Sequence, residues 1–140
     1  MEAMQISRSG MDVEWQRLEI VARNLANMNT TRTALGETYS PLRLVSGPSA
    51  GFGDYLDAAR NGGAQGVRVY SLETSGEPPR RVHDPDHPHA DEDGFVAYPR
   101  IDHAGEMVRM MSAARAYEAN IVALGAARQM YSRAIELGRR

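Results

Sequence analysis

The prolines of this chain are confined to its middle, and this confinement decides where a long helix can form. All seven prolines lie between Pro41 and Pro99, and most of the glycines lie in the same stretch. A proline inside a helix removes one backbone hydrogen bond and clashes with the preceding turn. The two ends of the 140-residue chain are therefore the places where a long helix can run without interruption.

The N-terminal segment has apolar residues in steps of three, four and seven, which is the spacing of one stripe along a helix. The pattern predicts a helix from about residue 4 to residue 28, roughly 37 Å long. Asn29 is the expected C-cap, because asparagine tolerates the left-handed conformation that ends many helices. The stripe consists of Met4, Met11, Trp15, Leu18, Val21, Ala22, Leu25 and Met28.

The C-terminal segment has a heptad pattern, in which two apolar series step by seven and interleave by three and four. The predicted helix has about 34 residues and is roughly 50 Å long, and Gly138 marks its end. A helix of this length with a narrow apolar seam needs a partner helix. The first series is Met107, Ala114, Ile121 and Ile135, and the second is Met110, Tyr117, Leu124 and Tyr131.

Two features of these helices each have two interpretations. Arg128 occupies a seam position, either as a long stem with its guanidinium in water or as half of a register-setting ion pair with a partner's glutamate. The chain also has eight methionines. They either fill an ordinary core or adapt the helices to several non-identical neighbours.

The middle of the chain, about residues 32–102, is predicted to form a few short strands, because β-forming residues alternate there between Gly and Pro signals. A glycine-rich loop, with one helical turn around residues 54–60, follows the first strand. The predicted fold class is α+β, with the segments 1–31 and 103–140 as a coiled-coil-like helix pair beside a small β-rich middle domain. The strand segments are SPLRLVSG, GVRVYSLE, PRRVHD and GFVAYP.

The sequence offers little to support an enzyme. The segment 83–93 holds three histidines and five carboxylates, but its spacing matches no metal motif and its prolines favour a solvated turn. GFGDYL has two glycines of a dinucleotide fingerprint and lacks the third. We therefore expect no catalytic residue, cofactor, metal or small-molecule substrate.

Charge and hydropathy argue against two further classes of partner. A formal net charge of −2 gives no electrostatic footprint for nucleic acid. No apolar run approaches the roughly 20 residues that span a bilayer, so we expect no membrane insertion. The N-terminal residues MEAMQISRSGMDVEW lack the basic and apolar regions of a cleavable signal peptide.

Three blocks of the sequence carry recognisable motifs. LEIVARNLANMNTTRT contains an asparagine-rich run, A-x-N-L-A-N-x-x-T, which is similar to the N-terminal motif of the bacterial flagellar axial protein family. GEMVRMMSAARAYEANIVALGAARQMYSRAIELG resembles the C-terminal end of its rod subgroup, and HDPDHPHADEDGFVAYPRIDHAGEM is similar to a middle motif of proximal-rod members. Ala114 stands where a serine is frequent, and Arg100–Ile101 replaces a usual Asn-Val.

The resemblance implies a structural subunit of the flagellar basal-body rod, the drive shaft that crosses the periplasm and transmits motor torque to the hook. It implies export by the flagellar type III apparatus without a cleaved signal. The implied partners are further copies and other rod proteins in a helical tube, together with membrane-ring and export-apparatus proteins. The terminal helices pair and pack against those of neighbours.

For the assembly interface we expect residues from both terminal helices. Asn24 and Asn27 would flank the first stripe and hydrogen-bond between helices, with Asn120 as a counterpart, at some cost in stability. The alternative is that these asparagines face water at a fraying helix end. The expected interface residues are Leu18, Val21, Asn24, Leu25, Asn27, Met28, Met107, Met110, Ala114, Tyr117, Asn120, Ile121, Leu124 and Tyr131.

The competing interpretation is a cytoplasmic coiled-coil adaptor that dimerises through the seam at residues 107–135 and binds a partner with its middle domain. An adaptor should form a discrete folded dimer. A rod subunit should be a monomer with frayed ends, or an open-ended polymer, because a helix seam without its partner cannot offset its ordering entropy.

Overall fold

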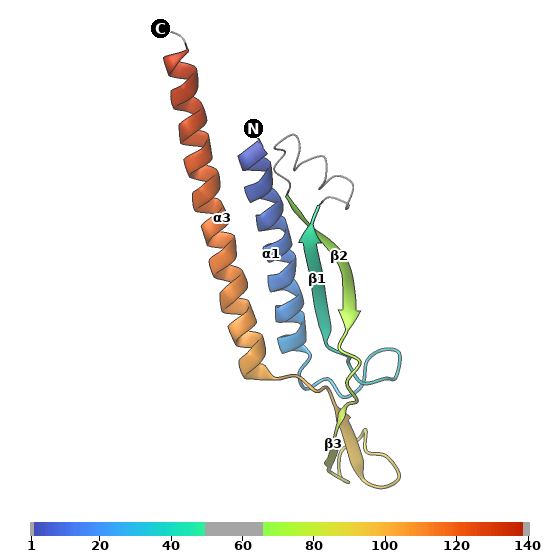
Figure 1. Cartoon of the computed structure of the whole chain (residues 1–140). Coiled ribbons are helices and arrows are strands. Elements are labelled where there is room, and N and C mark those ends of the chain that lie inside the picture. Colours follow the sequence, from blue (N-terminus) through green and yellow to red (C-terminus); the bar gives the residue numbers. More distant parts are fainter. Residues whose placement is uncertain (1, 50–65, 139–140) are drawn as a thin grey trace.

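The computed structural model describes residues 2–49 and 66–138 and has two long terminal helices packed side by side. Helix α1 spans Glu2–Ala26 and helix α3 spans His103–Leu137. Figure 1 shows them antiparallel, with the N-terminus of α1 and the C-terminus of α3 toward the same end. The predicted helix pair is confirmed, although α1 begins and ends about two residues earlier than expected.

The register of the helix pair is regular along its length. Gly10 lies against Asn120, so closely that a Cβ atom on Gly10 would be 2.8 Å from the Asn120 Oδ1 atom. Asn24 contacts Glu106 at the other end of α1. In both pairs the residue numbers add up to about 130. The start of α1 is thus level with residue 128, and the last turns of α3 extend roughly 13 Å beyond it (Figure 1).

The predicted heptad seam is divided between two surfaces. In the second series, Met110, Tyr117 and Leu124 are half-buried on the side of α3 that faces α1. In the first series, Met107 and Ile121 are exposed. The reason is that α3 has one partner helix within the chain, and a single helix covers only part of a seam.

The β-structure consists of two separate antiparallel hairpins. Strand β1 (Leu42–Pro48) pairs with β2 (Val67–Thr74), and β3 (Arg80–His83) pairs with β4 (Phe95–Tyr98). All four predicted strand segments are confirmed. The helical turn expected at residues 54–60 lies outside the described residues.

A small apolar core joins the first hairpin to α1. Val13 and Ile20 of α1 pack with Leu44 of β1, and Leu42 and Val69 adjoin them. Leu42 and Leu44 are two positions apart, so they project from the same face of β1. Residues from the expected segments 1–31 and 32–102 therefore share one core, while the division into three domains stays a prediction.

The second hairpin forms a tip that extends past the end of α1 (Figure 1). Val96 is fully buried within it. The Asp91 carboxylate accepts the Phe95 backbone N–H at 2.8 Å and forms an ion pair with Arg81. These interactions, the backbone hydrogen bond first, hold the pKa of the Asp91 carboxyl below its ordinary value. Carboxylates of the 83–93 segment thus stabilise a turn.

Replacing Leu44 by alanine should destabilise the purified chain by about 2–4 kcal/mol, because the core between β1 and α1 is small and Leu44 is one of its three buried members. Urea unfolding followed by circular dichroism measures the change. The matched control is Leu72→Ala on β2, opposite Leu44 in the hairpin but 53% exposed. The control should cost less, about 1 kcal/mol, because the Leu72 side chain is only partly buried. Equal losses in both variants would contradict the assigned core.

Candidate assembly surfaces and the polar junction

A buried asparagine connects α1, β1 and α3. The Asn24 side chain is 2% exposed. Its Nδ2 group donates to the Leu42 carbonyl oxygen at 2.8 Å and to the Glu106 Oε2 atom at 3.3 Å. Its Oδ1 atom accepts the Leu42 N–H and the Tyr39 hydroxyl, both at 2.9 Å. Four hydrogen bonds use the full capacity of the amide.

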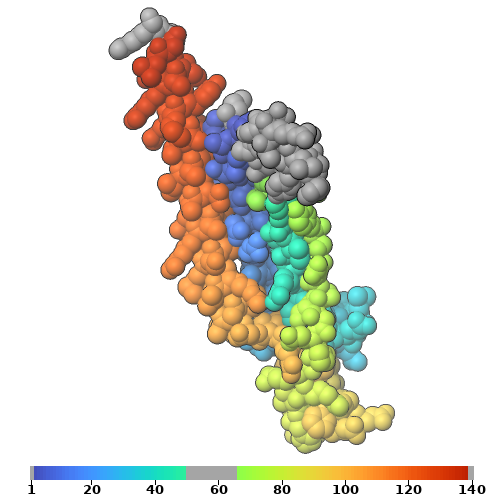
Figure 2. All heavy atoms as spheres, in the orientation of Figure 1, coloured from blue at the N-terminus to red at the C-terminus, as the bar shows by residue number. Residues whose placement is uncertain are grey.

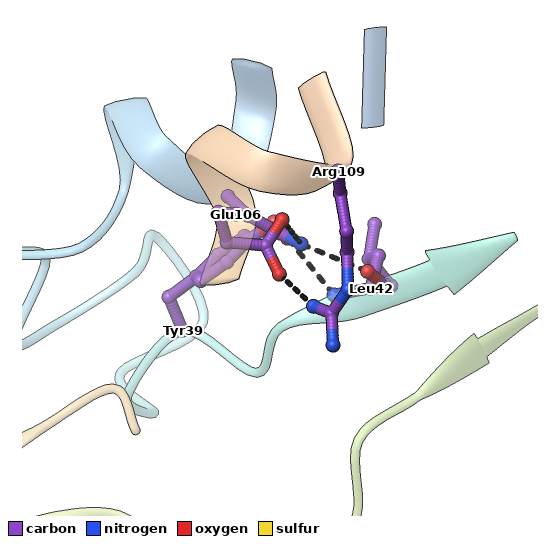
Figure 3. A network of polar contacts seen from close by, with 5 residues as sticks. Tyr39, Leu42, Glu106 and Arg109 are labelled. Atoms are coloured by element: carbon purple, nitrogen blue, oxygen red, sulfur yellow. Dashed lines mark hydrogen bonds and ion pairs between the residues drawn. The ribbon is translucent and has the colours of Figure 1, made fainter. Parts of the chain in front are cut away.

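The carboxylate of Glu106 is the acidic member of this network (Figure 3). It is 5% exposed and forms an ion pair with Arg109, one turn further along α3. Glu106 also lies in the first turn of α3, where the helix dipole favours a negative charge. A buried carboxylate is costly unless it is paired and hydrogen-bonded, and here it is both.

Tyr39 completes the group of five residues, Asn24, Tyr39, Leu42, Glu106 and Arg109, which we call the polar junction. Burial raises the pKa of the Tyr39 hydroxyl above its ordinary value. The hydroxyl therefore stays protonated near neutral pH and remains a hydrogen-bond donor to Asn24.

The asparagines of the N-terminal motif have different environments. Asn24 does bond to the other terminal helix, but through Glu106 and not through Asn120. The expected role of Asn120 as its counterpart is wrong, since the Asn120 Nδ2 group donates to Ala116 O within α3. Asn27 makes only local bonds, donating to Arg23 O and accepting from the Thr30 hydroxyl. The expected cap at Asn29 is also wrong, because α1 already ends at Ala26.

Exposed apolar side chains are distributed around α3 and do not form one stripe. Val108 and Val122 lie roughly opposite the side that carries Tyr117, because each residue advances about 100° around a helix. Val122 is 71% exposed. A helix that is apolar on most sides is normally surrounded by other elements. The exposed set on α3 is Met107, Val108, Met111, Ile121, Val122, Met130, Tyr131, Ile135 and Leu137.

A second apolar surface lies on the helix pair away from the β1–β2 hairpin. Trp15, the only tryptophan of the chain, is 61% exposed, and its ring centroid is 6.2 Å from that of Tyr117. Met107, Ala114 and Ile121 lie about half a turn around α3 from the residues that face β1. We call these five residues the back face.

The predicted interface residues fall into three classes of exposure in the isolated chain. Val21 and Asn24 are buried, and the exposed ones are Met107, Ile121 and Tyr131. The half-buried ones are Leu18, Leu25, Asn27, Met28, Met110, Ala114, Tyr117, Asn120 and Leu124.

Tyr39, Glu106 and the exposed valines of α3 were not among the expected site residues. Glu106 is the acidic residue in the first turn of α3, and this position was the available signal. Tyr39 lies in a loop with no periodic pattern, so no local signal pointed to it.

Residues 2–49 and 66–138 contain neither a metal cluster nor a membrane-spanning helix. No group of three or more His, Asp or Glu side chains is placed to hold a metal ion. His89 contacts the Thr31 hydroxyl, and His87 packs edge-on against Tyr98. In the same residues, neither helix has the length and apolarity to cross a membrane.

Both terminal helices match known protein families. Residues 4–32 match the family described as "Flagella basal body rod protein", and residues 92–137 match "Flagellar basal body rod FlgEFG protein C-terminal". The flagellar basal-body rod protein FlgC of Salmonella typhimurium is 35% identical over 133 residues, which are 95% of this chain and 93% of the relative. The chain belongs to the FlgC family. It is a structural protein of the flagellar basal-body rod and not an enzyme.

Other FlgC proteins match over nearly the same length. The FlgC protein of Borreliella burgdorferi is 33% identical, with 96% of this chain and 95% of the relative covered. That of Bacillus subtilis is also 33% identical, with 98% and 97% covered. In this FlgC-family chain the first matched segment contains most of α1, and the second contains β4 and all of α3.

Replacing Asn24 by alanine should destabilise the chain by about 2–4 kcal/mol, because it leaves the Leu42 backbone groups and part of the Glu106 carboxylate without partners. Asn27→Ala is the matched control and should cost less than about 1 kcal/mol, since its bonds are local and exposed. Urea unfolding of both purified variants makes the comparison. Equal effects would contradict a structural role of the polar junction.

Proposed function

We propose that this chain is a subunit of the proximal rod and packs through its terminal helices into the helical tube that carries motor torque across the periplasm. The observation that carries the proposal is the surface of α3. Its exposed valines and methionines lie on several sides of the helix, including the side away from α1. One partner helix within the chain cannot cover them, so we infer neighbours on more than one side.

The length of α3 supports the same arrangement. Beyond residue 128 this helix has no part of α1 beside it, yet Met130, Ile135 and Leu137 are apolar and exposed. Covering this segment in an assembly would contribute about 25 cal/mol of stabilisation for each Å² of apolar surface buried. We propose that helices of adjacent rod subunits cover this end. Arg128 is exposed at its base, and an ion pair with a neighbour's carboxylate stays a prediction.

The back face is the proposed centre of one contact between subunits. Tryptophan and tyrosine are enriched among the residues that dominate binding energies at interfaces. Met107 and Ile121, expected interface residues, flank the Trp15–Tyr117 pair on this surface. Methionine side chains adapt to differently shaped partners, which suits a subunit that contacts both copies of itself and other rod proteins.

The proposed export route and location rest on the family to which the chain belongs. We propose that the flagellar type III apparatus exports the chain without cleavage of a signal peptide. The rod lies in the periplasm. Membrane-ring proteins and proteins of the export apparatus are its further proposed partners.

Deleting the gene in its host should abolish swimming and leave basal bodies without a hook, because later axial proteins need the rod as a foundation. Motility plates and electron cryotomography of the cells measure both effects, and the intact gene should restore them. Normal flagella in a host without a second copy would contradict the proposal. The coiled-coil adaptor would then be the better interpretation, and sedimentation should find a discrete dimer.

Replacing Val122 by aspartate should abolish swimming without changing the stability of the purified chain. The side chain is 71% exposed, so the free energy of unfolding should change by less than about 0.5 kcal/mol. A buried contact between subunits would place the new carboxylate in an apolar environment. Thr74→Asp, at an exposed end of β2, is the control and should swim normally. Normal swimming of the Val122 variant would remove this side of α3 from the interface.

A further inference from the structure

A groove of about 380 Å³ opens between α1, β1 and α3. In Figure 2 the blue surface of α1 lies between the orange surface of α3 and the teal surface of β1. Ile20 and Val21 of α1, Leu44 of β1 and Ala116 of α3 supply apolar surface to it. The groove therefore offers an apolar site bounded by three elements.

Arginines line the same groove, and two of them have fixed partners. Arg17 pairs with Glu14 and donates to the Ser46 hydroxyl at 2.9 Å. Arg109 pairs with Glu106 of the polar junction. Arg43 also lines the groove, and within the described residues no carboxylate lies within ion-pair distance of it. The two carboxylates of the lining, Glu14 and Glu106, are the partners of Arg17 and Arg109. Arg43 leaves β1 on the opposite face to Leu42 and Leu44, so its cation stands at the rim of the groove, where it can accept an outside carboxylate.

A turn elsewhere on the chain has the complementary features. Leu35 is 90% exposed, more than any other large apolar residue in the described part of the chain. The Thr33 N–H donates to the Glu37 carbonyl oxygen at 2.7 Å, and the Gly36 N–H donates to Thr33 O at 2.9 Å. Gly36 has a φ of 87°, which an L-residue rarely adopts. The Leu35 turn, residues 33–37, therefore presents a leucine and a nearby carboxylate on a hydrogen-bonded loop.

The Leu35 turn does not face the groove of its own chain. Figure 1 shows the loop between α1 and β1 projecting on the side away from α3, whereas the groove lies between β1 and α3. An occupant from this turn must come from another copy. A helix is a poor occupant, because at a diameter of about 10 Å a volume of 380 Å³ holds about one turn or less. The tip of a turn, which inserts one or two side chains, needs less space than a helical turn.

We propose that the Leu35 turn of one subunit inserts into the groove of a neighbouring copy, with Leu35 against Ile20 and Leu44 and Glu37 beside Arg43. This inference rests on the proposed function, which brings copies of the chain together in the rod. The two surfaces differ, so the contact is head-to-tail and leaves one free groove and one free turn for further subunits. Such a contact builds a ring or a helix of subunits, as a tube requires.

Disulfide cross-linking tests the contact directly, because the chain has no cysteine of its own. Two full-length singly substituted chains, Leu35→Cys and Ser112→Cys, are co-expressed in cells that assemble basal bodies. Ser112 is exposed and lines the groove. We expect an oxidant-dependent dimer that contains one copy of each variant. The matched control replaces Ser112→Cys by Val122→Cys, which is on the same helix but outside the groove, and it should give no dimer with Leu35→Cys.

A second measurement uses the exposure of Leu35. Leu35→Asp should leave the unfolding curve of the purified chain unchanged, since the side chain is almost fully exposed, yet it should reduce the swimming halo strongly. Leu35→Met should swim normally, because methionine keeps the apolar contact. Normal swimming of Leu35→Asp would overturn the inference.

Two cross-linking outcomes would also overturn it. The first is the absence of the Leu35–Ser112 dimer in assembled basal bodies. The second is a Leu35→Cys dimer with the Val122 control alone. In either case the proposed function would still stand if the unsubstituted chain assembled into rods and the Val122→Asp variant did not. A deletion strain with normal basal bodies would instead remove the proposed function itself.

Discussion

The amide of Asn24 is the interaction on which the arrangement of the three main elements depends. It bonds both backbone groups of Leu42 and thereby occupies the place of a neighbouring strand at the outer edge of β1. Through Glu106 it also fixes where α3 begins along α1. A single side chain thus ties the first hairpin to both helices, and the apolar core and the Gly10–Asn120 contact hold the same arrangement further along α1.

Few apolar side chains of the described residues are buried, although the chain has 140 residues. The core of buried apolar residues between α1 and β1 is small, whereas much of the apolar surface of α3 remains in water. This balance is unusual for a protein that acts alone and reasonable for a subunit, because assembly can supply the burial that the single chain lacks. The polar junction therefore has a structural role in the single chain. Buried hydrogen bonds specify one arrangement of the elements before neighbours add stability.

The division of the heptad seam is consistent with this view. Within the chain, α1 covers the series that contains Tyr117 and Leu124, and the series of Met107 and Ile121 remains open. The two series form one seam in the sequence, and only the first is interrupted, by Arg128. A seam that is half covered can bind one partner inside its own chain and another outside it. Met107, Met111 and Met130 are exposed on α3, whereas Met4, Met11, Met28 and Met110 are half-buried, and the interpretation of the methionines as adaptable contacts stays a prediction.

The sequence by itself determined the elements and the family. The confinement of proline to the middle and the period of the apolar residues predicted the two helices. Alternating β-forming residues, in segments bounded by Gly and Pro, predicted the four strands. These signals are local, so the sequence is enough to find them. Only the tertiary structure decided that Asn24 bonds Leu42 and Glu106, that Asn120 bonds within its own helix, and which seam faces inward. The bonds of Asn24 join it to residues 18 and 82 positions away in the chain, and no local pattern records such a meeting. The Asn120 bond is itself local, but only the packing of the two helices places Gly10, and not an asparagine, against that side chain.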